Sequence, residues 1–169
     1  LQPALQTLVA MDIDAARLAR VGENLKRLGL NAECVAGDGA RPPASLGETF
    51  FDRILVDAPC SASGVIRRHP DIKLLRREAD LSALERRQGS ILQGLWPLLR
   101  PGGVLLYVTC SVLCEENSQV VDAFLAGNPD ASSEPFAVSW GEPLAHGRQL
   151  LPAIAGADGM FYAALRKAA

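Results

Sequence analysis

The sequence lacks the cysteine and histidine patterns that bind zinc or build a disulfide framework. It has only two histidines, and its four cysteines form no CxxC pair and have no histidine at zinc-ligand spacing: Cys34, Cys60, Cys110 and Cys114. Disulfide frameworks belong mainly to small secreted domains that are far richer in cysteine for their size. We therefore expect no metal site, and reduced thiols in a cytoplasmic protein.

Long apolar stretches are also missing. No apolar run approaches the roughly 20 residues that a helix needs to cross a bilayer, so we expect no membrane partner. With 169 residues, of which 49% are hydrophobic, the chain has the size and composition of one globular domain. It contains no internal repeat, and we expect residues 1–169 to form a single domain.

The sequence has no large excess of charge of either sign, since its net charge is −2. This balance does not by itself indicate a nucleic-acid partner. The charges are unevenly distributed, however, because residues 67–87 carry seven basic side chains against four acidic ones. On charge alone, such a run is best interpreted as the solvated face of a helix. The motif directly before it changes that balance.

Apolar runs alternate with segments of helical periodicity. Short buried strands are predicted at residues 7–11, 32–36, 51–56, 104–108 and 160–165, and helices at residues 14–28, 81–99 and 115–126. Asp14 is the expected N-cap of the first helix and Gly29 its end. The third helix is expected to hold two acids in its first turn, and residues 127–159 are expected to be rich in loops. Buried strands separated by helices predict a parallel sheet flanked by helices.

Four polar side chains fall at or just beyond the carboxyl ends of these strands, where such sheets bind ligands: Asp12, Asp38, Asp57 and Cys110. A carboxylate that closes a strand, as Asp12 does, can accept both hydroxyl protons of a ribose. The alternative for Asp12 is a helix cap, but Asp14 is better placed for that. Asp38 lies between two glycines and can reach an adenine amino group, although a plain Asp-Gly turn is an equally good interpretation.

Two cysteines stand in segments that are unusual for buried residues. Cys60 lies in the polar stretch Asp57-Ala-Pro-Cys-Ser-Ala-Ser-Gly64 after one strand, and Cys110 lies in Thr109-Cys-Ser111 after the next. A single cysteine is most often a small buried hydrophobe, but a loop rich in serine and glycine is a poor place for a core residue. Parallel strands would bring both thiols to one cleft, without the spacing of a metal site or a redox pair.

Two thiols and a carboxylate in one cleft suit the methylation of cytosine at C5. This carbon is too poor a nucleophile to take a methyl group directly, but a thiolate that adds to C6 makes C5 enamine-like. A carboxylic acid near N3 can stabilise the charge that this creates, and a base must afterwards remove the C5 proton so that the thiolate can leave. Cys110, Asp57 and Cys60 can fill these three roles.

The segments that carry this chemistry resemble the NOL1/NOP2/Sun family of RNA cytosine C5-methyltransferases. The resemblance lies in the stretch from Asp57 to Lys73, in Thr109-Cys-Ser111 and in the Glu115-Glu-Asn117 that follows. Residues 65–73 are most similar to the bacterial Sun/Fmu (RsmB) branch, which modifies one cytosine of small-subunit ribosomal RNA. Three further segments fit the pattern: Asp12-Ile-Asp14, Gly37-Asp-Gly39 and Asp158-Gly-Met-Phe-Tyr162.

This resemblance implies a Rossmann-like, class I methyltransferase sheet flanked by helices, with S-adenosylmethionine as cofactor. It makes Cys110 the nucleophile that bonds to C6, and Cys60 the residue that assists release. It turns three carboxylates toward the cofactor: Asp12, Asp38 and Asp57. It assigns four basic residues to ribosomal RNA, whose target base must be exposed or flipped to reach the cleft: Arg67, Arg68, His69 and Lys73.

Two features depart from the family pattern. Cys114 stands where the family often has proline, and we expect this change to be tolerated. The family's first strand and glycine-rich cofactor loop should precede Asp12 by roughly 20 residues, whereas only eleven residues without a glycine do so. In the family fold this strand lies between the strands that end at Asp12 and Asp57, so two strand edges are expected to be exposed.

The missing strand leads to an expectation about the 169-residue chain by itself. Such a chain is expected to bind S-adenosylmethionine weakly or not at all, and to be inactive alone. It is also expected to associate with itself, unless another segment fills the gap between the two strands. The N-terminal RNA-binding domain of the Sun branch is likewise expected to be absent.

Three other functions fit part of the sequence. A DNA cytosine C5-methyltransferase would use a Pro-Cys cysteine such as Cys60 as its nucleophile, but would leave Cys110 without a role. A non-catalytic RNA-binding fragment or paralogue would explain the missing cofactor loop but not an intact cysteine pair. A nucleotide-dependent α/β enzyme that uses Asp12 would leave both cysteine motifs unexplained.

Overall fold

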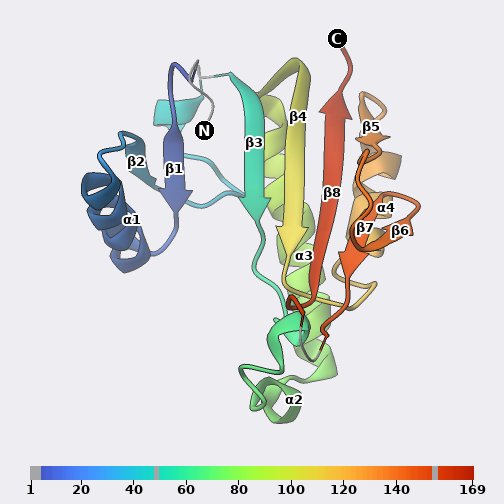
Figure 1. Cartoon of the computed structure of the whole chain (residues 1–169). Helices are drawn as coiled ribbons and strands as arrows, with labels where there is room; N and C mark the ends of the chain where they lie inside the picture. The colour runs from blue at the N-terminus through green and yellow to red at the C-terminus, as the bar shows by residue number, and fades with distance from the viewer. Residues whose placement is uncertain (1–4, 48–49, 154–155) are drawn as a thin grey trace.

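The structure is a computed structural model that describes residues 5–47, 50–153 and 156–169 (Figure 1). Its strands form two sheets. In the smaller one, β1 (Val9–Asp12) and β2 (Glu33–Ala36) run parallel, with Asp12 opposite Ala36. Helix α1 (Ala15–Leu28) connects these two strands. This unit is the strand–helix–strand pattern that the sequence predicts for residues 7–36.

The larger sheet has the strand order β3-β4-β8-β7-β6, and β5 also pairs with β8. Its strands are β3 (Phe51–Asp57), β4 (Leu99–Thr109), β5 (Ala131–Glu134), β6 (Glu142–Leu144), β7 (Gly147–Leu150) and β8 (Met160–Lys167). Only β3 and β4 pair in parallel, while the other pairings are antiparallel. The sheet is therefore mixed, and the expectation of a wholly parallel sheet was too simple.

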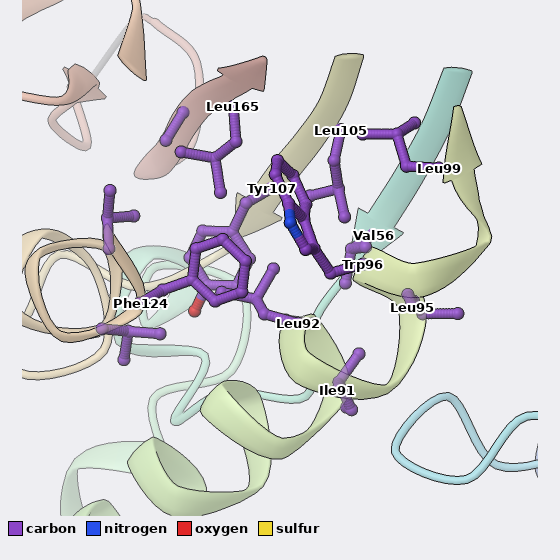
Figure 2. Packing of buried hydrophobic residues seen from close by; sticks show 14 of the residues in the cluster. Val56, Ile91, Leu92, Leu95, Trp96, Leu99, Leu105, Tyr107, Phe124 and Leu165 are labelled. Carbon is purple, nitrogen blue, oxygen red and sulfur yellow. The ribbon is translucent and has the colours of Figure 1, made fainter. Parts of the chain in front are cut away.

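Two helices cover one face of the larger sheet, α3 (Glu78–Leu95) and α4 (Ser118–Gly127). The core lies between these helices and the inner faces of β3, β4 and β8 (Figure 2). At its centre the rings of Trp96 and Phe124 meet edge to face, with centroids 5.1 Å apart, and Leu92 and Leu105 are completely buried. None of the helices in the described part of the chain is long and apolar enough to span a membrane.

Four short helical segments lie in the connections. They are η1 (Ala44–Leu46), η2 (Ser63–Val65), α2 (Ile72–Leu75) and η3 (Trp96–Leu98). Both η2 and α2 belong to the long connection between β3 and α3, which Figure 1 shows extending past the end of the sheet. This connection carries Cys60 and the basic residues of the predicted RNA side, so the fold places them at one end of the molecule.

The carboxyl ends of β1, β3 and β4 point the same way (Figure 1). Asp12 and Asp57 are the last residues of β1 and β3, and Cys110 directly follows β4. Asp38 follows β2, which is parallel to β1. The four polar residues therefore lie along one rim of the fold, as the strand order predicts.

β1 and β3 each keep an unpaired edge within the described residues, since β1 pairs only with β2, and β3 only with β4. These are the two strands between which the sequence comparison with the family predicts a further strand. No described segment fills this position. Of the eleven residues before Asp12, the first four lie outside the described part of the chain.

Local signals predicted some boundaries well and others badly. The Asp14 side chain accepts hydrogen bonds from the N–H groups of Ala16 and Arg17, and Gly29 ends α1 in the left-handed region with φ 64°. The helix predicted at residues 115–126 instead begins at Ser118, so the two acids are not in its first turn. Within the described residues of 127–159, a stretch predicted to be rich in loops, lie the strands β5 to β7. These strands are short, β6 contains proline and β7 glycine, and β5 is made of alanine, serine and glutamate. Pairing of β5 and β7 with β8, and of β6 with β7, therefore decides them rather than propensity.

Candidate functional site

Two thiols meet beyond the ends of the parallel strands β3 and β4. The Sγ atoms of Cys60 and Cys110 are 3.3 Å apart and share a hydrogen bond. Both residues are partly buried, and neither is in a disulfide. The parallel pairing continues past the strands, because the N–H of Ala58 donates to the carbonyl of Val108 at 2.9 Å. The strand pairing therefore carries the two cysteine motifs to the same place.

The backbone of the Cys60 loop is fastened to the Cys110 loop at Gly64. The Gly64 N–H donates to the Cys110 carbonyl at 2.9 Å, and the Gly64 carbonyl accepts from the N–H of Gly159, also at 2.9 Å. A Cβ at position 64 would overlap the Gly159 carbonyl oxygen and lie 2.7 Å from its carbon. Only glycine allows three chain segments to approach this closely.

A buried carboxylate lies directly behind the thiols. Glu116 has no exposed surface, and its Oε1 accepts from the N–H of Ser61 at 2.7 Å. Its Oε2 accepts from the Ser111 hydroxyl at 2.6 Å, and the Gln88 amide donates to Oε1 at 3.2 Å. From the sequence, Glu116 was identified only as part of a motif and was predicted to lie on a helix. Gln88 was also missed, although a polar residue in the apolar series of Ile91, Leu92 and Leu95 is a usable signal.

The Cys110 loop is held from its other side by buried amides. Asn117 accepts from the Thr109 hydroxyl at 2.6 Å and donates to the Ser111 carbonyl at 3.0 Å. The Gln149 amide from β7 donates to the same carbonyl at 3.2 Å. All of these side chains are buried, so the hydrogen bonds form away from competing water and fix the loop firmly.

The pKa values of the two thiols are shifted in opposite directions. The hydrogen bond from Cys60 lowers the pKa of the Cys110 thiol to about 7, although burial and the negative charges of Asp57 and Glu116 act against it. The same hydrogen bond and burial raise the pKa of Cys60 well above its usual range. The pKa directions therefore favour ionisation of Cys110, while Cys60 keeps its proton and donates a hydrogen bond to the Cys110 thiolate.

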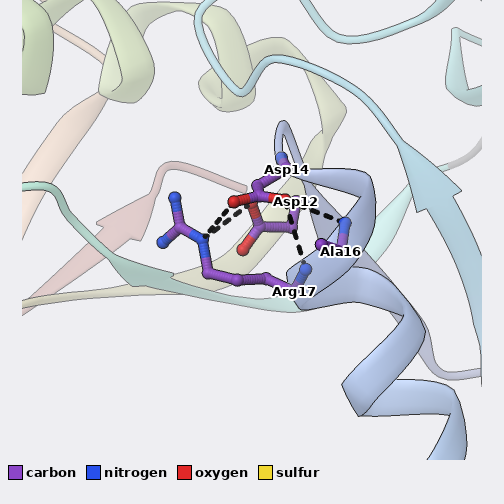
Figure 3. A network of polar contacts seen from close by, with 4 residues as sticks. All are labelled: Asp12, Asp14, Ala16 and Arg17. Atoms are coloured by element: carbon purple, nitrogen blue, oxygen red, sulfur yellow. Dashed lines mark hydrogen bonds and ion pairs between the residues drawn. The ribbon is translucent and has the colours of Figure 1, made fainter.

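The three predicted cofactor carboxylates differ in their partners. Asp57 is exposed, and its carboxylate makes no hydrogen bond to another described residue. Asp12 accepts from the N–H of Asp14 at 2.7 Å, and the Arg17 guanidinium lies 3.8 Å from the same oxygen (Figure 3). A carboxylate has about four acceptor positions, so both residues keep capacity for a ligand with hydroxyl or amino groups.

Asp38 forms an ion pair with an arginine, Arg87, that was not predicted as its partner from the sequence. Both carboxylate oxygens accept from Arg87 of α3, at 3.0 and 2.6 Å, and one also accepts from the N–H of Ala40 at 2.8 Å. The Arg87 guanidinium holds the pKa of the Asp38 carboxyl below its usual range, with help from the Ala40 N–H. Arg87 was counted only as part of the basic run, because its partner lies in another element.

The basic residues of the predicted RNA side lie on the exposed connection after Cys60: Arg67, Arg68, His69 and Lys73. Two of them also make contacts inside the molecule. Arg67 donates to the Ala153 carbonyl at 2.7 Å and pairs with Asp158 at 3.3 Å, and Arg68 pairs with the same carboxylate. Arg67 and Arg68 keep 41% and 67% of their side-chain surface exposed, which leaves them accessible to a ligand.

No three or more His, Cys, Asp and Glu side chains among the described residues are grouped so that they could hold a metal ion. The polar groups at the site are instead thiols, carboxylates, hydroxyls and amides. Such a set can provide a nucleophile, a proton donor or acceptor, and hydrogen bonds to a planar heterocycle. The chemistry available from the chain itself is therefore covalent and acid–base catalysis.

Comparisons with known proteins found relatives in sequence and in fold. A family model described as "16S rRNA methyltransferase RsmB/F" matches residues 1–166. Ribosomal RNA small subunit methyltransferase B of Cronobacter sakazakii is 53% identical over 161 residues, which is 95% of this chain and 37% of that protein. The protein of the same name from Klebsiella pneumoniae is 54% identical over 160 residues, 95% of this chain and 36% of its own length.

A solved structure shares the fold. The crystal structure of NSun6 from Pyrococcus horikoshii with SFG superposes with a TM-score of 0.82 at 31% identity, over 96% of this chain and 42% of that one. This likeness confirms the methyltransferase fold class that the sequence predicts. The chain spans 36–37% of the length of the two curated relatives described above.

Proposed function

Because this chain belongs to the 16S rRNA methyltransferase RsmB/F family, we propose that it is the catalytic part of an RNA cytosine methyltransferase. The reaction transfers a methyl group from S-adenosylmethionine to C5 of a cytosine in small-subunit ribosomal RNA. The observation that supports this most directly is the pair of thiols, with Sγ atoms 3.3 Å apart, at the carboxyl ends of two parallel strands. This reaction needs a nucleophile that adds to C6 of the cytosine and a base that removes the proton from the adjacent C5.

Cys110 acts as the nucleophile. Its thiolate adds to C6 of the cytosine, and a proton shared between the Asp57 carboxyl group and N3 stabilises the charge that this creates, so that electron density moves to C5. C5 then takes the methyl group. The pKa of Cys110, lowered to about 7 by the Cys60 hydrogen bond, makes a large fraction of this thiol available as thiolate at neutral pH.

Cys60 assists release of the product. Once Cys110 is bonded to carbon it no longer carries a negative charge, so the interaction that held the proton on Cys60 is lost. Cys60 can then lose its thiol proton to water, and the resulting thiolate takes the proton from C5. The electron pair of the C5–H bond restores the double bond between C5 and C6, and the Cys110 thiolate leaves.

The rim carboxylates form the cofactor side. S-adenosylmethionine supplies the methyl group when it is bound. Asp12 would accept from the ribose hydroxyls and Asp57 from the methionine amino group, and the acceptor capacity that both keep supports these roles. Asp38 would accept from the adenine amino group with the acceptor position that its bonds to Arg87 and Ala40 leave over.

The exposed basic residues form the RNA side. Arg68, His69 and Lys73 lie on the connection that carries Cys60 and would contact phosphates and bases near the target nucleotide. Arg67, whose side chain is 41% exposed, would join them. The cytosine would be unstacked or flipped to reach the thiols, because these are partly buried behind the rim.

The roles of the two cysteines are tested by replacing each with alanine in the protein and incubating it with small-subunit ribosomal RNA and S-adenosylmethionine. Cys60→Ala is expected to accumulate a covalent protein–RNA adduct that survives a denaturing gel, because Cys110 can attack but cannot be released. Cys110→Ala is expected to form no adduct. An adduct that needs Cys60 and not Cys110 would reverse the roles and favour the DNA-type mechanism. Binding of RNA without an adduct or 5-methylcytosine in any variant would favour a non-catalytic RNA-binding protein.

A further inference from the structure

We propose that Glu116 is a positioning residue that sets the distance between the two thiols, with one carboxylate oxygen holding each cysteine loop. The inference rests on the proposed function, since that function requires Cys60 and Cys110 to act on adjacent carbons of one base. Glu116 touches neither sulfur through a hydrogen bond. It acts through the residue that follows each cysteine.

The two oxygens of the Glu116 carboxylate make equivalent contacts with the two cysteine loops. Oε1 accepts from the N–H of Ser61, directly after Cys60, at 2.7 Å. Oε2 accepts from the hydroxyl of Ser111, directly after Cys110, at 2.6 Å. The serine hydroxyls also contact each other, at 3.3 Å between Ser61 and Ser111. Those contacts are neutral and longer, whereas hydrogen bonds to a carboxylate are stronger.

Glu116 is itself fixed from several directions. The Tyr107 hydroxyl of β4 donates to the Glu116 carbonyl at 2.7 Å, and Gln88 of α3 bridges the carboxylate to the Pro59 carbonyl. The carboxylate therefore joins a strand and a helix of the core to both cysteine loops. A change of its position would be transmitted to Ser61 and Ser111 together.

A buried carboxylate without a basic partner lowers the stability of the fold, so folding by itself does not explain why Glu116 is present. Glu116 is fully buried, and its side-chain partners within the described residues are three neutral donors rather than a basic side chain. Burying a charge without an opposite charge costs free energy that neutral residues would not. The charge also acts against the thiolate of Cys110. The charge of Glu116 therefore does not favour the thiolate, and its hydrogen bonds to both cysteine loops point to a geometric role for this acid.

The charge of Glu116 and its positioning of the loops have opposite expected effects on the pH at which Cys110 ionises. The direction in which this pH moves after substitution therefore tests the proposal. The titratable groups that bear on Cys110 are the Cys60 thiol, which favours the thiolate, and the carboxylates of Asp57 and Glu116, which oppose it. A backbone hydrogen bond at Cys110 itself also favours the thiolate. Replacing Glu116 by glutamine removes a nearby negative charge, which by itself would make Cys110 ionise at lower pH. If Glu116 instead holds Cys60 against Cys110, its loss weakens the hydrogen bond between them and makes Cys110 ionise at higher pH.

The measurement is the pH dependence of alkylation by iodoacetamide, followed peptide by peptide by mass spectrometry on the full chain without RNA or cofactor. The exposed thiol of Cys34 serves as the internal reference. Glu116→Gln presents an amide where the Ser111 hydroxyl needs an acceptor. Ser111→Ala breaks the same contact but keeps the charge. Glu115→Gln is the matched control, because it removes one charge from the adjacent residue, whose side chain contacts Cys114 rather than Ser61 or Ser111. Cys60→Ala gives the full effect of losing the thiol donor.

Both Glu116→Gln and Ser111→Ala are expected to raise the midpoint of Cys110 alkylation by about 0.5–1 pH unit, toward the value of Cys60→Ala. At pH 7 this is a roughly two- to fivefold slower reaction, while Glu115→Gln leaves the midpoint in place. A lower midpoint in Glu116→Gln, or an unchanged midpoint in both variants despite a lower melting temperature, would overturn the proposal. If Glu116→Gln does not fold, Ser111→Ala alone decides in the same way.

The outcome is separate from that of the proposed function. The alkylation midpoint depends only on the two thiols and their supports, whereas the adduct experiment needs RNA and cofactor. A raised midpoint together with an adduct through Cys60 would leave Glu116 as the residue that positions the pair and would change only which cysteine attacks. An adduct through Cys110 with an unmoved midpoint would leave the reaction intact and remove Glu116 from it.

Discussion

Gly64 joins three chain segments behind the thiols, and replacing it with alanine should damage both the stability and the site. The new Cβ would overlap the Gly159 carbonyl oxygen and lie 2.7 Å from its carbon. These atoms belong to the backbone, so no side-chain rotation can relieve the overlap. The two segments must move apart, which breaks the 2.9 Å hydrogen bonds that Gly64 makes with Cys110 and with Gly159.

The expected cost follows from those two hydrogen bonds. Each buried hydrogen bond contributes about 0.5–1.5 kcal/mol to the free energy of unfolding, so the loss of both costs about 1–3 kcal/mol. For a domain of this size, 1 kcal/mol corresponds to roughly 2–4 °C in melting temperature. Gly64→Ala is therefore expected to melt about 4–8 °C below the parent protein, taking about 2 kcal/mol as the centre of that range.

Thermal unfolding followed by circular dichroism measures this effect, with Gly89→Ala as the control. Gly89 lies inside α3, and a Cβ there meets nothing within 4 Å. In a helix interior alanine is favoured over glycine by about 0.5–1 kcal/mol, so this control should melt slightly higher than the parent. A Gly64→Ala protein that melts within 1 °C of the parent would refute the idea that the contact of three segments is tight.

Two further substitutions test the core and a salt bridge. Leu92→Ala removes a completely buried side chain from the core between α3 and the sheet and should lower the free energy of unfolding by about 2–5 kcal/mol. In the same urea titrations Leu74→Ala, at a position that is 85% exposed, should change it by less than about 0.5 kcal/mol, and equal effects would contradict the described core. Asp38→Asn should cost up to about 1 kcal/mol at pH 7, because its partly exposed pair with Arg87 is lost. The pKa of Asp38 is lowered in the folded protein. The contribution of Asp38 to the free energy of unfolding is therefore present above its unfolded pKa of about 3.9 and is lost as the pH falls below that value. A stability difference between parent and variant that stays constant down to about pH 2 would contradict this assignment.

Features that depend on neighbouring residues were predicted correctly from the sequence. The cap at Asp14 and the end of α1 at Gly29 each require one side chain or one backbone conformation within a few residues, so the local pattern is sufficient. Asp57 and Cys110 were correctly placed at strand ends because buried apolar runs of this length have few alternatives.

Features that depend on partners far along the chain were not predicted. β6 and β7 carry no strong strand signal and are strands because they pair with each other and with β8. The same limit applies to Asp38, whose main partner Arg87 belongs to a helix after the next strand. Glu116 follows a strand and precedes a helix, and nothing in its immediate neighbours indicates that it turns inward to Ser61.

The sequence by itself determined the family, the order of the main strands and helices outside residues 127–159, and the placement of the two cysteines after strands, because each of these is written in short motifs or in periodicity. Only the tertiary structure decided how the thiols relate to each other. Cys60 and Cys110 are brought within 3.3 Å by the pairing of β3 with β4, and the difference in their acidity arises from that contact. The carboxylate of Glu116 joins their loops by hydrogen bonds between residues 55 positions apart. Such contacts form only when the chain is folded, since their strength depends on burial and on distances that no local pattern specifies.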